Sequence, residues 1–117
     1  MTVRHVFLWS VKDKQQGASV LAQLAGLPEQ IPGLKNWAIG EHIGDTPHAS
    51  GDLRFDYALT CDFEDFDELQ SYQNHPAHQA VVDRIMPLYA DWAVADLELS
   101  PNHEKVAVPA GSSGKHS

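Results

Sequence analysis

The chain has 117 residues, 16 of them acidic and 8 basic, which gives a net charge of −8. A single domain of this length buries about two-thirds of its unfolded surface, and the 43% hydrophobic content predicts that it folds. An acidic surface repels phosphate backbones and anionic lipid, which argues against nucleic-acid and membrane partners. The single cysteine, Cys61, cannot form an internal disulfide, and this favours a cytoplasmic location.

Strand patterns occur in four segments of the chain. Side chains alternate between two faces in residues 3–10, 34–43, 55–63 and 92–99. His5, Phe7 and Trp9 share one face of the first segment, and Tyr57 and Leu59 share one face of the third. If these faces look toward the helices, the five side chains line the same space.

Helical patterns separate the strands. Residues 14–30 carry an apolar stripe that ends before Ile31-Pro32-Gly33. Residues 62–68 contain five carboxylates, which we interpret as the solvated start of a second helix anchored by Phe66 and Leu69. A third helix begins at Pro76, because proline suits the first helical position, and it breaks near Pro87.

The order of these elements predicts the fold class. The pattern β-α-β-β-α(α)-β is typical of an α+β, ferredoxin-like domain with a four-stranded antiparallel sheet and helices on one face. We expect this domain to span residues 1–99, and we expect residues 100–117, with little apolar content, to form a flexible tail. The other face of the sheet would expose Val6, Leu8 and Ala58, so a second copy is the predicted cover and the protein is expected to be a homodimer.

His78 is the candidate general base. It falls in the first turn of the third helix, where the helix dipole and partial burial both favour a neutral imidazole that can accept a proton. Tyr72, just before that helix, supplies a phenol that can orient a carbonyl or enol oxygen. The alternative interpretation is structural, with a half-buried histidine and a core tyrosine.

The remaining candidates form the walls of a small-molecule pocket with a few convergent polar groups. The predicted substrate-binding residues are His5, Phe7, Trp9, Tyr57, Leu59 and Val82. His75 is better explained as a helix cap than as a metal ligand, because a cap residue and a first-turn residue point in different directions and no Glu-x-x-His or cysteine pair accompanies His75 and His78. The sequence therefore predicts no metal site.

Three segments resemble the stress-responsive α/β-barrel (Dabb) family. They are residues 3–9, Pro32-Gly33 before a strand, and Tyr72-x-x-His75-Pro76-x-His78, and the resemblance covers about residues 2–99. It implies a dimeric α+β barrel. Olivetolic acid cyclase-like members of the family are similar at His78, Tyr72 and His5, which implies cofactor-free chemistry with the first as base and the second orienting the substrate.

The leading hypothesis is a cofactor-independent enzyme of the cyclase, lyase or isomerase type that acts on an oxygenated, partly apolar substrate. His78 would remove a proton beside a carbonyl, Tyr72 would hydrogen-bond the enolate, and His5 would position a substrate oxygen. Two alternatives stay open: a non-catalytic, dimeric, stress-associated protein that binds a small molecule, and a cofactor-independent monooxygenase.

Overall fold

A computed structural model of the chain describes residues 2–45 and 53–99. The strands are β1 (Thr2–Val11), β2 (Lys35–Glu41), β3 (Tyr57–Phe63) and β4 (Tyr89–Leu99). The helices are η1 (Lys14–Gln16), α1 (Gly17–Ala25), α2 (Leu27–Gln30), α3 (Phe66–Asn74), α4 (Pro76–Ile85) and η2 (Met86–Leu88), where η marks a single 3₁₀ turn. In the part of the chain described, none of the helices combines the length and apolar character needed to cross a bilayer.

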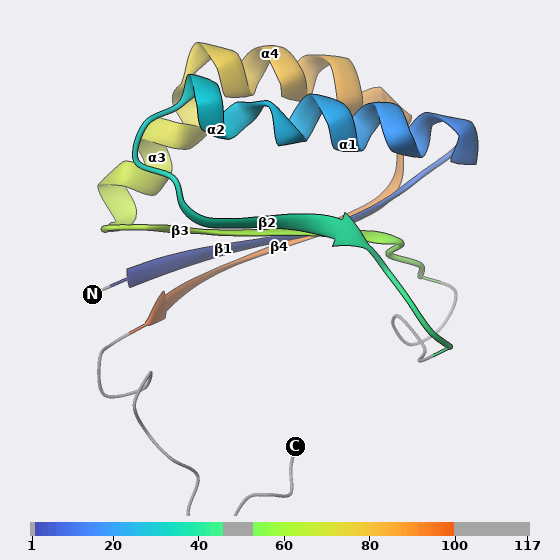
Figure 1. Cartoon of the computed structure of the whole chain (residues 1–117), viewed down its shortest axis with the longest axis horizontal. Coiled ribbons are helices and arrows are strands. Elements are labelled where there is room, and N and C mark those ends of the chain that lie inside the picture. Colours follow the sequence, from blue (N-terminus) through green and yellow to red (C-terminus); the bar gives the residue numbers. More distant parts are fainter. Residues whose placement is uncertain (1, 46–52, 100–117) are drawn as a thin grey trace, which may run out of the picture.

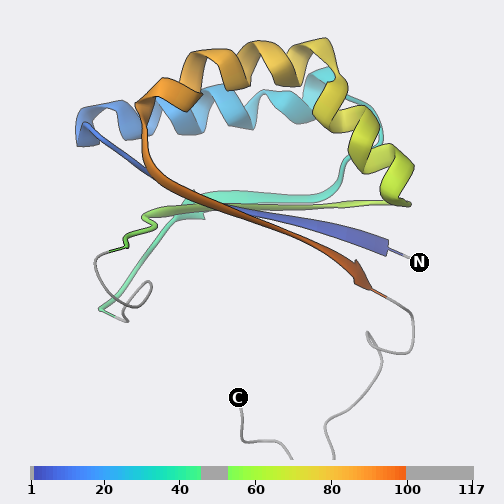
Figure 2. The same ribbon diagram turned by 180° about the vertical axis from the view of Figure 1, so that it is seen from behind.

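The four strands form one antiparallel sheet in the order β2-β3-β1-β4, and helices α1 to α4 all lie on the same face of it (Figure 1). Seen from behind, the helices again lie on one side of the sheet, and none of the described helices lies on the other side (Figure 2). This arrangement confirms the predicted α+β, ferredoxin-like fold. In this order β1 pairs with both β3 and β4, so β1 lies inside the sheet and β4 at its edge.

Several element boundaries differ from the prediction: β2 ends at Glu41 and β3 begins at Tyr57, both shorter than predicted, and β1 is one residue longer at each end. The expected helix over residues 14–30 is divided into η1, α1 and α2, and the break between α1 and α2 falls at Gly26. Strand β4 begins at Tyr89 rather than Trp92, because the chain turns directly from η2 into pairing with Val11. The predicted tail, residues 100–117, lies outside the described residues.

The core lies between the helices and the odd-numbered face of β1. Its fully buried side chains come from both layers and include Trp9, Val20, Leu27, Leu59, Phe63, Leu69 and Ile85. The strand periodicity of two correctly assigned Trp9 and Leu59 to the helix side. Phe66, which was expected to anchor α3, is 55% exposed and that expectation is wrong, because the helix starts at this residue and presents it to solvent.

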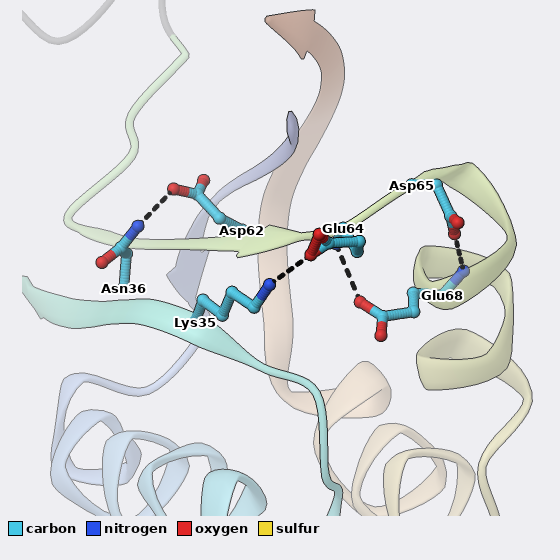
Figure 3. A network of polar contacts seen from close by, with 6 residues as sticks. All are labelled: Lys35, Asn36, Asp62, Glu64, Asp65 and Glu68. Carbon is cyan, nitrogen blue, oxygen red and sulfur yellow. Dashed lines mark hydrogen bonds and ion pairs between the residues drawn. The ribbon is translucent and has the colours of Figure 1, made fainter. Parts of the chain in front are cut away.

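Asp62 belongs to a buried polar network and not to a solvated helix start, so that part of the prediction is wrong. It is the last polar residue of β3, and its carboxylate accepts hydrogen bonds from Arg4 on β1 at 2.8 and 3.0 Å. It also accepts a 2.8 Å bond from Asn36 on β2 (Figure 3). The Arg4 guanidinium and then the Asn36 amide hold the pKa of Asp62 below its usual range, while burial opposes them.

Glu64 and Glu68 continue the polar surface toward α3. Lys35 donates to Glu64 at 2.6 Å, and Glu68 accepts from the backbone N–H of Glu64 (Figure 3). Asp65 caps α3, because its carboxylate accepts the backbone N–H of Glu68 at 2.9 Å. The carboxylates after Asp62 therefore behave as predicted for a helix start.

His75 joins α3 to α4. It is the C-terminal cap of α3 and also the N-terminal cap of α4, where its Nδ1 accepts the backbone N–H of Ala77 at 3.0 Å. Pro76 occupies the first turn of α4, as predicted. Tyr72 in the last turn of one helix and His78 in the first turn of the next therefore flank a one-residue corner.

Candidate active site

A cavity of about 150 Å³ lies between the sheet and the helical layer. It is lined by His5, Phe7, Leu24, Leu59, Tyr72, Gln73, His78, Val82, Ile85, Met86, Tyr89, Trp92 and Val94. Strands β1, β3 and β4 and helices α1, α3, α4 and η2 all contribute to this wall. Most of the lining is apolar, and the polar groups gather where α3 meets α4, an arrangement typical of small-molecule sites.

Tyr72 and His78 face one another across the corner at His75. Their ring centroids are 4.4 Å apart and the ring planes are inclined by 53°. Both side chains line the cavity. A phenol hydroxyl and an imidazole are therefore available to the same bound molecule.

The hydrogen bond to Gln73 determines which nitrogen of His78 is free. The Nδ1 atom of His78 lies 3.1 Å from the Gln73 carbonyl oxygen. Because a carbonyl oxygen only accepts, Nδ1 must carry the hydrogen, which leaves the lone pair of the neutral ring on Nε2. Burial lowers the pKa of His78 below the ordinary 6.5, and His5 and His75 act in the same direction against the opposing carbonyl. Near pH 7, the ring is therefore a neutral base.

Tyr72 is held as a protonated phenol. Its side chain is 2% exposed and its ring contacts Phe63, with centroids 5.2 Å apart. Burial raises the pKa of Tyr72 far above its ordinary value, because the phenolate would lose its hydration. At neutral pH, the hydroxyl is therefore a hydrogen-bond donor.

His5 reaches the same region from β1. Its ring meets that of Tyr72 edge to face, with centroids 6.0 Å apart. Its Nδ1 lies 2.6 Å from Oδ1 of Asp96 on the neighbouring strand β4. Because a carboxylate accepts, this contact places a hydrogen on Nδ1 and leaves Nε2 as the second ring nitrogen for a ligand.

The structure brings most of the predicted residues together. His5, Phe7, Leu59 and Val82 line the cavity with the predicted catalytic pair. Trp9 and Tyr57 do not.

Trp9 and Tyr57 lie on the predicted face but toward the far end of β1. Trp9 is fully buried and stacks on Phe7 and Tyr57, with ring centroids 5.3 and 5.6 Å away. Tyr57 lines a separate hollow that includes Lys14 and Arg54. Trp9 and Tyr57 therefore lie outside the lining of the cavity, which Trp9 contacts through Phe7.

Four functional candidates are absent from the sequence-based prediction. Asp96 lies in a predicted strand, but the pattern of that strand gives no sign that it pairs with His5. Met86, Tyr89 and Trp92 line the cavity from η2 and β4. Tyr89 continues the apolar stripe of α4, which was a usable signal, whereas the position of Asp96 depends on the register between β1 and β4.

Cys61 is a buried thiol beside the site. It is 0% exposed, and burial raises its pKa to about 12, so it is a thiol rather than a thiolate near neutral pH. A buried thiol of this kind packs as a small hydrophobic side chain. Within residues 2–45 and 53–99, no three histidine, cysteine or carboxylate side chains are grouped as metal ligands would be.

Known proteins resemble this chain in sequence and in fold. An uncharacterized protein from Streptomyces coelicolor is 31% identical over 101 residues, which cover 82% of this chain and 98% of that protein. A dimeric ferredoxin-like protein of unknown function from Thermobifida fusca has a TM-score of 0.69 at 32% identity, with 85% of this chain and 92% of that chain covered. The hydroxynitrile lyase of Passiflora edulis has the same fold at 18% identity, with a TM-score of 0.73 and coverage of 86% and 94%.

A family model spans nearly all of the described chain. The stress responsive A/B barrel domain (Dabb) model matches residues 3–99. Apart from Thr2 at the start of β1, this range contains all the strands and helices of the described residues and the whole lining of the cavity. The first predicted segment and the Tyr72–His78 element both fall inside this match. The chain therefore belongs to the stress responsive A/B barrel domain family.

Proposed function

We propose that the protein is a cofactor-independent enzyme of the lyase, isomerase or cyclase type that removes a proton beside a carbonyl group. The observation that carries the proposal is the 4.4 Å approach of the Tyr72 and His78 rings in one wall of a cavity. One ring is a neutral base and the other a protonated donor near pH 7. Enolisation needs this combination.

The proposed step uses three side chains. Nε2 of His78 takes the C–H proton, and the electron pair of that bond forms a C=C double bond while the π pair of the carbonyl moves onto its oxygen. The Tyr72 hydroxyl donates to this oxygen as its negative charge grows. His5 holds a second oxygen of the substrate. Return of the proton at another position gives an isomerase, and attack of the enolate carbon on a second carbonyl gives a cyclase.

Proton exchange in D₂O tests this proposal without knowledge of the natural substrate. We expect the wild-type protein to exchange the α-protons of small ketones faster than buffer does, as measured by NMR. General-base catalysis is worth about 10²–10⁴-fold, so His78→Ala should lose about that factor. His42→Ala removes an imidazole outside the cavity and should keep the rate. Equal exchange by His78→Ala, in a variant with an unchanged circular dichroism spectrum, would refute the base assignment.

A non-catalytic, stress-associated binding protein is the second candidate, and the mainly apolar lining of the cavity favours it. Binding of ketones without any exchange would support this candidate. A monooxygenase would consume oxygen with an electron-rich substrate, which an oxygen electrode would register in the same samples. The hydroxynitrile lyase that shares the fold makes a small cyanohydrin a further useful test compound.

We also propose that two copies pair through the helix-free face of the sheet. This face carries Val6, Leu8 and the 45% exposed Leu97, and a hollow of about 470 Å³ opens beside Leu8 and Ala58. Apolar sheet faces of this kind are normally covered. The relative from Thermobifida fusca is described as dimeric, which supports the same assembly here.

A cytoplasmic location and polyketide ring closure of the olivetolic acid cyclase type remain narrower proposals. The first is supported by the buried free thiol of Cys61. The second is supported by the presence of His5, Tyr72 and His78 around one cavity.

A further inference from the structure

The cavity has a polar end and an apolar end. Helix α4 and strand β1 run along it in the same sense, because α4 leads through η2 into the pairing of Tyr89 with Val11. His5 and His78 lie toward the start of these two elements. Met86, Trp92 and Val94 lie toward the other end, where the phenol of Tyr89 stands among mostly apolar side chains. A ligand that fills the cavity therefore has its polar atoms at one end and its apolar atoms at the other.

The apolar end opens beside the outer strand β4. Trp92 and Val94 pair with Trp9 and Phe7 of β1, so both share the helix side of the sheet. Trp92 is nevertheless 52% exposed, and its ring lies 6.4 Å from that of Phe7. Met86, which is 42% exposed, approaches the same opening from η2. Because these lining residues are the most exposed ones, we take this side as the entrance to the cavity.

The volume limits the size of the occupant. An engineered apolar protein cavity of about 150 Å³ holds one benzene molecule. The cavity of this chain has about the same volume. One six-membered ring or a branched group of similar size fills it, and a carbonyl on that group reaches the polar end.

We propose that the substrate is a compact carbonyl compound with one ring or an equally small apolar group, and that Trp92 limits its size at the entrance. The inference rests on the proposed function for the placement of the carbonyl beside Tyr72 and His78. It adds the substrate class and a specificity residue. A fused-ring compound collides with Trp92 in this arrangement, and a very small ketone leaves the apolar end unfilled.

Dissociation constants for three methyl ketones test the inference. The compounds are butan-2-one, acetophenone and 2-acetonaphthone, and binding is measured by NMR titration. One methylene changes discrimination by about 10–200-fold, so the wild type should bind acetophenone at least about tenfold more tightly than either of the others. Trp92→Ala should reduce the preference for acetophenone over the naphthyl ketone to below about threefold. Phe66→Ala removes an exposed aromatic ring outside this cavity and should keep the wild-type order.

Each outcome decides one question. Equal or tighter binding of the naphthyl ketone by the wild type, an unchanged preference in Trp92→Ala, or no binding of any ketone overturns the inference. Selective binding without α-proton exchange keeps the size limit and refutes the catalytic proposal. Exchange without size selection keeps the catalytic proposal and refutes the size limit.

Discussion

Nδ1 of His5 lies 2.6 Å from Oδ1 of Asp96, and the two residues are direct cross-strand partners between β1 and β4. The His5 side chain is 8% exposed and the Asp96 side chain 30%. The carboxylate thus reaches the imidazole from the solvent side and fixes the direction of its ring. Through this pair, β4 acts on the polar end of the cavity.

Removing the carboxylate should affect catalysis more than stability. We expect Asp96→Ala to lower α-proton exchange by about tenfold to hundredfold, since small misplacements of a positioning group have effects of this size. Asp96→Asn can still accept from Nδ1 and should recover part of the rate. Glu98→Ala removes a carboxylate from the same strand and should have no effect. A wild-type rate and pH profile in Asp96→Ala would contradict the positioning role.

The lowered pKa of His78 predicts the pH dependence of both activity and stability. Activity should fall only below the folded-state pKa, which is below 6.5. The unfolded chain binds the His78 proton at a higher pH than the folded chain, so the contribution to stability is complete above about 6.5 and is lost as the pH falls through the folded pKa.

Urea unfolding of wild type and His78→Gln at pH values between about 5 and 8 measures this linkage. The unfolding free energy of the wild type should decrease relative to that of His78→Gln as the pH falls. The comparison cancels the effect of carboxylates such as Asp62. A difference that does not change with pH would contradict burial as the cause of the lowered pKa.

Gly17 is required by the position of Tyr57. A Cβ atom at Gly17 would lie 2.0 Å from the phenol oxygen and 2.8 Å from the ring carbon that carries it. Helix propensity favours alanine over glycine by about 0.5–1 kcal/mol, but overpacking costs about 1–3 kcal/mol, so Gly17→Ala should destabilise the protein. Gly26→Ala meets only ordinary contacts and should not. The midpoint temperatures of thermal unfolding of the wild type and the two variants measure this difference.

A second substitution separates the clash from other effects. Tyr57→Phe removes the oxygen and should recover part of the stability of Gly17→Ala, with the ring carbon still too close for full recovery. Strict additivity of the two changes in unfolding free energy would contradict a direct collision.

Charge on the helix-free face should prevent dimer formation. We expect the wild-type protein to sediment as a dimer at micromolar concentration and Leu8→Asp to sediment as a monomer, because a carboxylate would be buried without a partner. Ile43→Asp changes a residue that is 87% exposed and should leave the dimer intact. A wild-type monomer would contradict the proposed assembly.

The fold and the central histidine were predictable because they depend on local pattern. Alternation placed His5, Phe7 and Leu59 on the helix side, and Pro76 marked the start of α4. The alternation of side chains gives the face on which a residue lies, but it does not tell how far along the strand the cavity extends. Trp9 shares the face of His5 but is taken up by stacking with Tyr57, and alternation alone cannot distinguish the two ends of a strand.

The contacts that were missed depend on strands far apart in the chain. Asp96 meets His5 and Asp62 meets Arg4 only because of the registers in which β4 and β3 pair with β1. A run of carboxylates such as residues 62–68 has the same local pattern whether its first member is buried or solvated. The register between paired strands decides between these states, and the alternation of side chains along one strand does not determine that register.

His75 serves two helices at once, and this makes the site sensitive to chain length. One additional residue taken up in the first turn of α4, ahead of His78, would move His78 by about 100° around the helix axis relative to the corner, since a helix has about 3.6 residues per turn. Tyr72 would keep its place while the imidazole of His78 swung out of reach. In a relative of this protein, the spacing between that tyrosine and that histidine is therefore a better guide to shared chemistry than the presence of either residue.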